Sequence, residues 1–244
     1  MSFKVVKFDQ VMQSMGLKLP KSLFKQVARF LCLYKADNLV SLAKSKSPLI
    51  AENSAYALKH INITYDFDLG QLQPYVSQKN LVVCNHATGF LEVFILIDLL
   101  HKAGFDFRFL ANDFIKIIPD VEQLVIPVDV YSDDPHKRIN AVRSIMGALN
   151  KNLTLAAFPS GEVARFSWKK MRIVEGSWNQ NLLDMAVRAK ANIIELEIKA
   201  KNSFLFYFCA LLNPLLPTLL LFREYFNKKN RHYTVTLKNI ERYK

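Results

Sequence analysis

The sequence is poor in the residues that build disulfide frameworks, metal sites and dinucleotide-binding loops. Its 244 residues include three cysteines, which lie far apart with no Cys-x-x-Cys pair. Such scattered cysteines exclude a disulfide framework, suit a reducing compartment and lack the spacing of metal ligands. The seven glycines form no glycine-rich dinucleotide-binding loop. We therefore expect neither a bound metal nor a bound cofactor.

A secretory signal is also missing from the first twenty residues. Lys4, Lys7, Asp9 and Lys18 interrupt this stretch, so it has no long apolar core. Together with the unpaired cysteines, this absence favours a location at the cytoplasmic face of a membrane, peripheral or interfacial.

Basic and apolar residues are plentiful. The chain has 33 Lys and Arg against 21 Asp and Glu, a net charge of +12, and 51% of its residues are hydrophobic. The charge indicates an acidic partner. So high an apolar and phenylalanine content does not resemble a nucleic-acid-binding surface, which needs exposed polar and stacking groups. We expect a membrane surface with anionic lipids, or an acidic substrate, and no nucleic acid.

Apolar runs of strand length alternate with helical segments along the chain. This alternation predicts an α/β fold with a mixed, largely parallel central sheet flanked by helices. Residues 1–58 are expected to form an N-terminal helical appendage, and residues 59–244 the main domain. We expect strands at about 61–67, 81–85, 107–112, 124–130, 153–158, 193–198 and 233–237, and helices at about 91–103, 135–149 and 178–189.

The most informative stretch is the histidine segment, residues 83–92 (Val-Cys-Asn-His-Ala-Thr-Gly-Phe-Leu-Glu). A buried strand ends at Asn85 and His86, Gly89 supplies a turn, and Glu92 lies in the first turn of a helix. A carboxylate there can accept a hydrogen bond from one imidazole nitrogen and leave the other to take a substrate proton. Cys84 is two residues from His86, so a Cys–His pair is a second interpretation, and a buried structural cysteine is a third.

A second stretch, the proline segment, covers residues 153–165 and contains Phe-Pro-Ser-Gly-Glu at its centre. Pro159 and Gly161 predict a turn after a strand. The turn would present backbone N–H groups with Ser160, Glu162 and Arg165, a set that suits a phosphate or a developing oxyanion. An ordinary surface connection remains the alternative.

Together, the two segments resemble the glycerolipid acyltransferase family, which includes the 1-acylglycerol-3-phosphate acyltransferases. His86 and Glu92 are similar to its His–acid motif, with five residues between them where four are commonest. Phe158 to Gly161 is similar to its Phe-Pro-x-Gly motif, with Ser160 at a position that is usually acidic. Further similarity points to the haemolysin-like, lyso-ornithine-lipid acyltransferase branch, and lies at 109–113, 126–129, Trp178 and 201–203.

The resemblance covers about residues 60–240 and implies transfer of a fatty acyl chain from a thioester to a lysolipid or lipid precursor. It implies His86 as the general base and Glu92 as its orienting carboxylate, and acyl-CoA or acyl-carrier protein as the donor. The expected substrate-binding residues are Phe158, Pro159, Ser160, Gly161, Glu162 and Arg165, with Asn85, Arg108, Asn112 and Lys169 as further candidates. Two alternatives are a serine hydrolase using Ser160 and a basic module that binds anionic lipid without catalysis.

Two segments point to a membrane surface. Residues 204–222 carry no charge, but Asn213, Pro214 and Pro217 interrupt them, which opposes a spanning helix. We expect two short helices, at about 202–213 and 215–226, that lie in the interface or line an acyl tunnel. The cations expected to meet head groups are Lys199, Lys201, Arg223, Lys228, Lys229 and Arg231.

The other segment is Lys21 to Tyr34. Apolar residues recur there at helical spacing, with Lys25 and Arg29 elsewhere on the helix. This pattern is typical of an interfacial anchor. It also fits a helix packed on the protein's own core.

Overall fold

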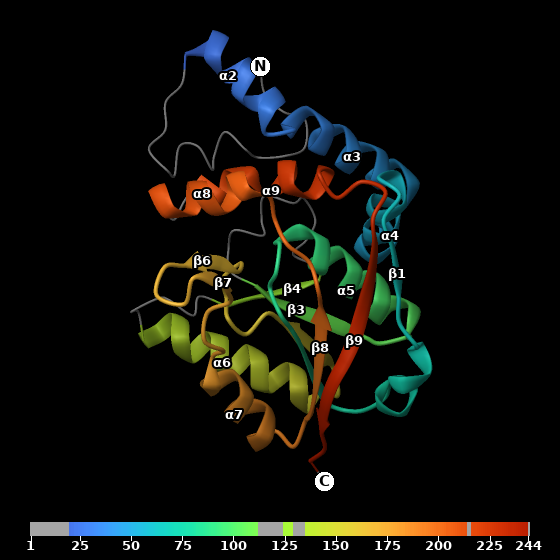
Figure 1. The fold of residues 1–244 in the computed structure, drawn as a ribbon. Coiled ribbons are helices and arrows are strands. Elements are labelled where there is room, and N and C mark those ends of the chain that lie inside the picture. The colour runs from blue at the N-terminus through green and yellow to red at the C-terminus, as the bar shows by residue number, and fades with distance from the viewer. Residues whose placement is uncertain (1–19, 112–123, 129–134, 214–215, 244) are drawn as a thin grey trace.

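The computed structural model describes residues 20–111, 124–128, 135–213 and 216–243. Within them, the main strands are β1 (Thr64–Asp66), β2 (Asn80–Cys84), β3 (Phe107–Ala111), β4 (Val125–Pro127), β5 (Thr154–Ala157), β8 (Asn192–Ile198) and β9 (His232–Glu241). They form one sheet in the order β1-β9-β8-β2-β5-β3-β4 (Figure 1). Among the strands of this sheet that the structure describes, only the β8–β9 pair is antiparallel. The predicted mixed, largely parallel α/β fold is confirmed.

Helices cover both faces of the sheet. They are α2 (Lys21–Phe30), α3 (Leu33–Lys46), α4 (Ile50–His60), α5 (Phe90–Lys102), α6 (Pro135–Asn150), α7 (Gln180–Arg188), α8 (Phe204–Leu212) and α9 (Leu216–Phe226). Val82 and Cys84 of β2 belong to the core under α3, α4, α5 and α9. Leu81 and Val83 belong to the core under α6 and α7. Alternate residues of β2 thus serve opposite faces, which explains why β2 is a continuous apolar run.

Two strands differ in length from their predictions. The strand expected at 61–67 is reduced to Thr64–Asp66, whereas the one expected at 233–237 extends over His232–Glu241. The last strand is long because it pairs with β1 on one side and with β8 on the other. A hairpin of β6 (Arg165–Ser167) and β7 (Arg172–Val174) was not predicted.

The stretch from Lys21 to Tyr34, which was expected to form one helix, contains all of α2 and the start of α3. The chain breaks between α2 and α3 at Cys32, whose φ of 59° is left-handed. Leu31 and Ala28 are buried, whereas Leu23, Phe30 and Tyr34 are 40–47% exposed. The segment therefore packs on the core with one side and leaves apolar side chains on the other. Whether residues 1–58 form a separate domain stays a prediction.

The apolar stretch near residue 210 forms two helices, as predicted. α8 ends at Leu212 and α9 begins at Leu216. Among the described residues, no helix has the length and apolar character needed to cross a membrane. α9 packs deeply, with Leu219, Leu220 and Phe222 buried, whereas α8 buries only Phe206 and Tyr207.

Candidate active site

The sheet brings the histidine and proline segments together. β2 and β5 are parallel neighbours, with Val83 opposite Ala157, so the residues that follow them leave the same edge of the sheet. Open α/β sheets place ligands at this edge. The His86 ring stacks on the Phe158 ring, with 4.3 Å between their centroids and 17° between their planes. Two segments about seventy residues apart in the sequence thus form one site.

Glu92 is buried beside His86 at the start of α5. His86 Nδ1 lies 3.0 Å from Glu92 Oε1, which also accepts hydrogen bonds from the Thr88 N–H (2.6 Å) and the Gly89 N–H (2.7 Å). The Thr88 hydroxyl donates to Glu92 Oε2. Gly89 caps α5 with a φ of 105°, and a Cβ there would lie 2.5 Å from Leu221. The turn therefore requires glycine twice, for its conformation and for the close packing of α9.

This capping geometry explains the spacing of the histidine and the acid. Glu92 is the third residue of α5, the position from which a side chain reaches back to the N-cap N–H. The preceding Leu91, where the commonest family pattern has its acid, is 1% exposed and belongs to the core. An acid at position 92 thus serves the helix cap and His86 with the same oxygen.

The carboxylate of Glu92 is ionised despite its burial. Burial raises its pKa, but hydrogen bonds from His86, Thr88 and Gly89 outweigh this effect and lower the pKa to about 2. A carboxylate only accepts hydrogen bonds, so His86 Nδ1 must carry the proton in this pair. The other ring nitrogen, Nε2, is thereby left as an acceptor for a proton.

The turn of the proline segment is formed as predicted, but its N–H groups are not arranged as expected. Gly161 is left-handed (φ 66°), and its N–H donates to the Phe158 carbonyl at 2.9 Å. Pro159 has no N–H to offer. In this arrangement neither Pro159 nor Gly161 directs an N–H group toward a substrate, and an oxyanion-binding role for the turn stays a prediction. The Pro159 carbonyl accepts from the Asn179 N–H, which joins the turn to the residue before α7.

Glu175, which sequence reasoning did not find, joins the two segments. Its Oε1 accepts hydrogen bonds from the His86 N–H (2.9 Å) and from the Ser160 hydroxyl (2.6 Å). A carboxylate thus reaches the neighbourhood of Ser160 from another part of the chain. No sequence pattern marks it, because Glu175 simply follows the short strand β7. The Ser160 hydroxyl also lies 3.0 Å from the Glu162 carbonyl, so acceptors other than a substrate surround the proposed hydrolase nucleophile.

A cavity of about 1170 Å³ opens beside His86. One wall is apolar and comes from α5, α8 and α9; it includes Phe90, Val93, Ile97, Phe206, Leu221 and Phe222. The other side mixes apolar side chains of α6 and α7, such as Ile145 and Leu182, with polar groups from the proline segment and these two helices, among them Ser160, Arg165, Asn179, Arg138 and Arg188. The space exceeds that of a typical small-ligand pocket and offers different surroundings to the two ends of an amphipathic molecule.

The remaining predicted site residues are less closely grouped. Arg165 lines the cavity, and its guanidinium Nη2 lies 3.6 Å from the Glu162 carboxylate Oε2. Asn85 is not among the lining residues: its amide bonds both the N–H and the carbonyl of Ile198 and so ties β2 to β8. Arg108 pairs with Asp106, and exposed Lys169 lies in the turn after β6; neither lines the cavity. Asn112 lies outside the described residues.

Cys84 is a core residue. Its side chain is fully buried, and burial raises the pKa of the thiol well above its usual value. A buried, protonated thiol is a poor nucleophile, which disfavours the Cys–His interpretation. In the described part of the chain, no three His, Cys, Asp or Glu side chains gather as metal ligands do.

The fold and the site define an open α/β protein with a His–Glu pair and a two-sided cavity at the carboxyl edge of its sheet. Comparisons with family models and with curated proteins gave no match. Among solved structures, the chain is similar to the 1-acyl-sn-glycerophosphate (LPA) acyltransferase PlsC from Thermotoga maritima. The two share 12% sequence identity with a TM-score of 0.44, over 92% of this chain and 88% of that chain. At this distance, the function has to rest on the site itself.

Proposed function

We propose that the protein is an acyltransferase that moves a fatty acyl group from a thioester to the hydroxyl, or amine, of a lysolipid or lipid precursor. The observation that carries this proposal is the His86–Glu92 pair beside the two-sided cavity. The apolar wall suits an acyl chain, and Arg165 suits the phosphate or carboxylate of an acceptor. The resemblance of the histidine and proline segments to glycerolipid acyltransferases points to the same reaction.

In the proposed reaction, His86 Nε2 takes the proton of the acceptor hydroxyl as its oxygen attacks the thioester carbonyl carbon. Glu92 holds the ring through Nδ1 and stabilises the imidazolium that forms. The tetrahedral intermediate collapses, the C–S bond breaks, and the leaving thiolate takes the proton back from His86. The products are an acyl ester and a free thiol, and no acyl-enzyme is required.

The proposed donor is acyl-CoA or acyl-carrier protein. Both are acidic, so a protein of net charge +12 attracts either one. α6, on the polar side of the cavity, has no Asp or Glu over residues 135–150 and contributes Arg138 to the lining. A basic helix at this place suits the phosphates of the donor.

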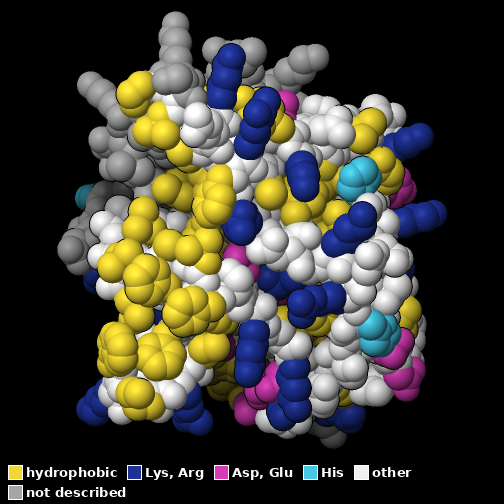
Figure 2. Space-filling view, turned by 45° about the horizontal axis from the view of Figure 1, so that its top comes forward, with side chains coloured by type: hydrophobic (Ala, Val, Ile, Leu, Met, Phe, Trp, Pro, Cys, Tyr) yellow, Lys and Arg dark blue, Asp and Glu magenta, His cyan; other side chains and the backbone are white. Residues whose placement is uncertain are grey.

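We further propose that the protein works as a peripheral protein on the cytoplasmic face of a membrane, with α8 against the lipid. Four apolar side chains of α8 point outward, with exposed fractions of 83% for Phe204, 66% for Leu212, 46% for Phe208 and 38% for Leu211. Figure 2 shows hydrophobic side chains gathered on the side where α8 lies in Figure 1, with Lys and Arg side chains beside them. Since Phe206 of the same helix lines the cavity, a lipid could pass from this surface to His86.

The decisive experiment measures acyl transfer by the purified protein and by His86→Asn. Long-chain acyl-CoA and acyl-carrier protein are offered with a panel of lysolipids, and thiol release and acylated lipid are quantified. The Asn amide can still donate to Glu92, so the capped turn keeps its partner. Alanine would leave the buried carboxylate short of a hydrogen bond, at a cost of about 1–3 kcal/mol. We expect His86→Asn to lose about 10²–10⁴ in rate.

Circular dichroism and vesicle binding provide the controls. Both should be unchanged in His86→Asn. Transfer at the parent rate by the folded variant would refute the general-base role. If the protein binds anionic vesicles but turns over no thioester with any acceptor, it is a non-catalytic lipid-binding module.

A further inference from the structure

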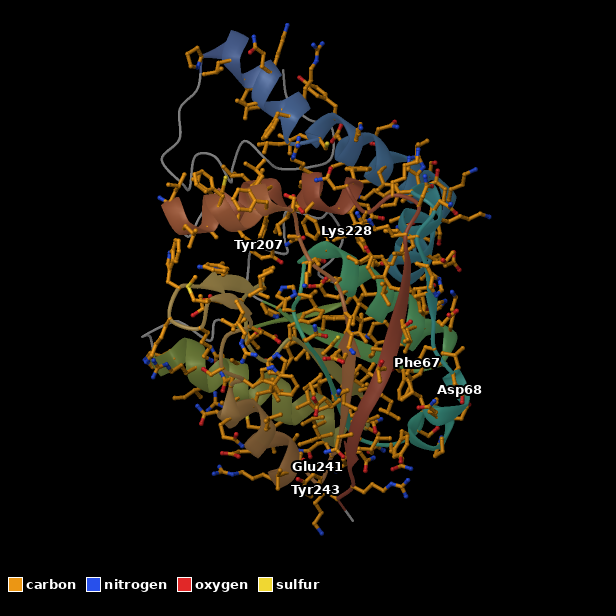
Figure 3. All side chains as sticks on the ribbon, viewed as in Figure 1. Phe67, Asp68, Tyr207, Lys228, Glu241 and Tyr243 are labelled. Carbon is orange, nitrogen blue, oxygen red and sulfur yellow. The ribbon has the colours of Figure 1, made fainter. Side chains whose placement is uncertain are left out.

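A buried polar network lies beneath α8 and α9, where apolar packing would be expected. Glu224 of α9 and Lys228, in the turn that follows α9, are 1% and 3% exposed, and Asn202, which precedes α8, is 8% exposed. In Figure 3, Lys228 and Tyr207 lie just below the ribbons of α8 and α9, toward the sheet. The Lys228 ammonium donates to Asn202 Oδ1 at 2.7 Å and to the Glu224 carbonyl at 2.9 Å. Lys228 is therefore unavailable to lipid head groups, which corrects the sequence-based expectation.

The network continues to the His86 site. Asn202 Nδ2 donates to the Thr88 carbonyl at 3.2 Å. Thr88 in turn holds Glu92, through its N–H on one carboxylate oxygen and its hydroxyl on the other. A continuous chain of hydrogen bonds thus runs from Lys228 through Asn202 and Thr88 to the carboxylate that meets His86.

The other end of the network fixes Asn202 in place. Glu224 accepts from the Ser203 N–H (2.7 Å) and from the Ser203 hydroxyl (2.6 Å), next to Asn202 in the chain. The Asn202 N–H donates to the Tyr207 hydroxyl at 3.0 Å. Both the backbone and the side chain of Asn202 are therefore held, so its amide can point to Thr88 only in a narrow range of directions.

Stability alone is a weak reason for such a network. Burial lowers the pKa of Lys228 to about 8, against the opposing effect of Glu224, so desolvation outweighs pairing for this ammonium. Buried ion pairs are often replaced by apolar residues without loss of stability. What an apolar replacement cannot supply is a directed hydrogen bond to the Thr88 carbonyl.

We propose that Asn202, held by Lys228, is a positioning residue that fixes Thr88 and thereby aims the Glu92 carboxylate at His86. The inference deepens the proposed function, because an aimed Glu92 matters only if the His86 ring does chemistry. It also assigns to α9 a task at the site besides lining the cavity. The network joins the helix that follows the proposed membrane surface to the proposed general base.

Asn202→Asp tests the proposal with little change in shape. The carboxylate still accepts from Lys228 but has no donor for the Thr88 carbonyl. A matched control is Asn80→Asp, because Asn80 is 0% exposed and its amide donates to the Tyr75 and Gln78 carbonyls at the far end of β2. We expect kcat to fall about ten- to a hundredfold in Asn202→Asp with KM little changed, as for a misplaced catalytic group. Asn80→Asp should lower the melting temperature and leave kcat unchanged.

A spectroscopic measurement makes the test independent of acyl transfer. The imidazole ¹⁵N shifts of His86, assigned by comparison with His86→Asn, report which ring nitrogen carries the proton. They should change in Asn202→Asp and stay as in the parent in Asn80→Asp. If Asn202→Asp lowers only the melting temperature, with kcat and the His86 shifts unchanged, the network is a brace and the proposal is wrong. If no thioester is turned over, the His86 ¹⁵N shifts still test whether Asn202 positions the His86–Glu92 pair.

A second variant guards against misfolding of the first. The double substitution Lys228→Met with Glu224→Gln removes both buried charges together and leaves Asn202 without its ammonium partner. We expect a melting temperature equal to or above the parent's, a lower kcat and altered His86 shifts. A parent-like kcat and parent-like shifts in this variant would equally overturn the proposal.

Discussion

At the scale of single residues, Glu92 joins the capping of a helix to the geometry of the site. One of its oxygens meets His86 Nδ1 and the N–H groups of Thr88 and Gly89. A substitution at this position therefore changes the start of α5 and the orientation of the imidazole together. Effects of Glu92 variants on stability and on turnover have to be measured side by side.

The ionised Glu92 should stabilise the fold in a defined pH range. Its pKa is lowered from 4.5 to about 2 in the folded protein, so its contribution is complete above about pH 4.5 and is lost as the pH falls through about 2. The lowering corresponds to roughly 3 kcal/mol. Urea unfolding between pH 5.5 and 2.5 should show a shallower loss of stability for Glu92→Gln than for the parent. Glu162→Gln, an exposed control, should follow the parent, and parallel curves for all three proteins would contradict the prediction.

Loss of Arg165 should weaken binding of the acyl acceptor more than binding of the acyl donor. It lines the cavity with a side chain that is 38% exposed. If it meets an anionic acceptor, Arg165→Ala should raise the acceptor KM about tenfold and the donor KM much less. That is the low end for a lost charge-assisted contact, because solvent screens the charge. Steady-state kinetics with each substrate varied in turn measures both constants. The exposed Lys169, substituted by Ala, serves as the control, and equal changes in both KM values for Arg165→Ala would place Arg165 elsewhere.

Sequence patterns mark some residues of the site and miss others for a physical reason. His86 and Glu92 are close in the chain and flank a strand–helix turn, so local spacing predicts their contact. Glu175 and Asn202 meet the histidine segment only through tertiary packing, 89 and 114 residues away along the chain. The prediction that Lys228 meets lipid head groups is wrong for the same reason. A lysine after an apolar helix has the pattern of a head-group ligand, and only the packing of α9 buries it.

At the scale of elements, prediction succeeds where one segment has a strong apolar period. β2 and β5 are fully buried and mostly apolar, α5 and α6 are long, and the bounds of all four agree closely with expectation. The hairpin of β6 and β7 was not predicted because each strand has only three residues, too few to show an alternation of apolar and polar side chains. The helix break at Cys32 was not predicted because a non-glycine residue takes a left-handed conformation there, and no sequence pattern marks such a residue.

The outward face of α8 should govern binding to lipid. A double substitution of Phe204 and Leu212 by Ser removes two of its most exposed apolar side chains. Each should lose about 1–2 kcal/mol of transfer free energy, since insertion into the interface is partial. Partitioning onto anionic vesicles should then fall roughly thirty- to several-hundredfold, since the two losses add. Ile139→Ser on α6, where the side chain is 48% exposed, controls for general loss of surface hydrophobicity, and equal losses in both variants would argue against an α8 surface.

At the scale of the whole molecule, charge and sheet topology act over distances longer than any contact. The net charge of +12 should make vesicle binding depend on anionic lipid and fall as salt rises, because the screening length shortens from about 10 Å at 0.1 M to 3 Å at 1 M. Co-sedimentation with phosphatidylserine-containing vesicles and with purely zwitterionic vesicles, over a salt series, measures this. Vesicle binding that changes with neither salt nor lipid charge would contradict this prediction and would leave insertion of α8 as the source of affinity.

The position of β9 has a consequence for how the protein is made on the ribosome. β9 lies between β1 and β8 in the sheet, yet it is synthesised after both of them. Until residues 232–241 emerge, β1 has no partner and β8 presents an unpaired border, and such borders recruit other chains. A nascent chain therefore holds the complete His86 segment while its sheet is still unclosed. Termination of synthesis before β9 would therefore release a fragment with unpaired strand edges, which is prone to aggregate, and not a slightly shortened form of the folded protein.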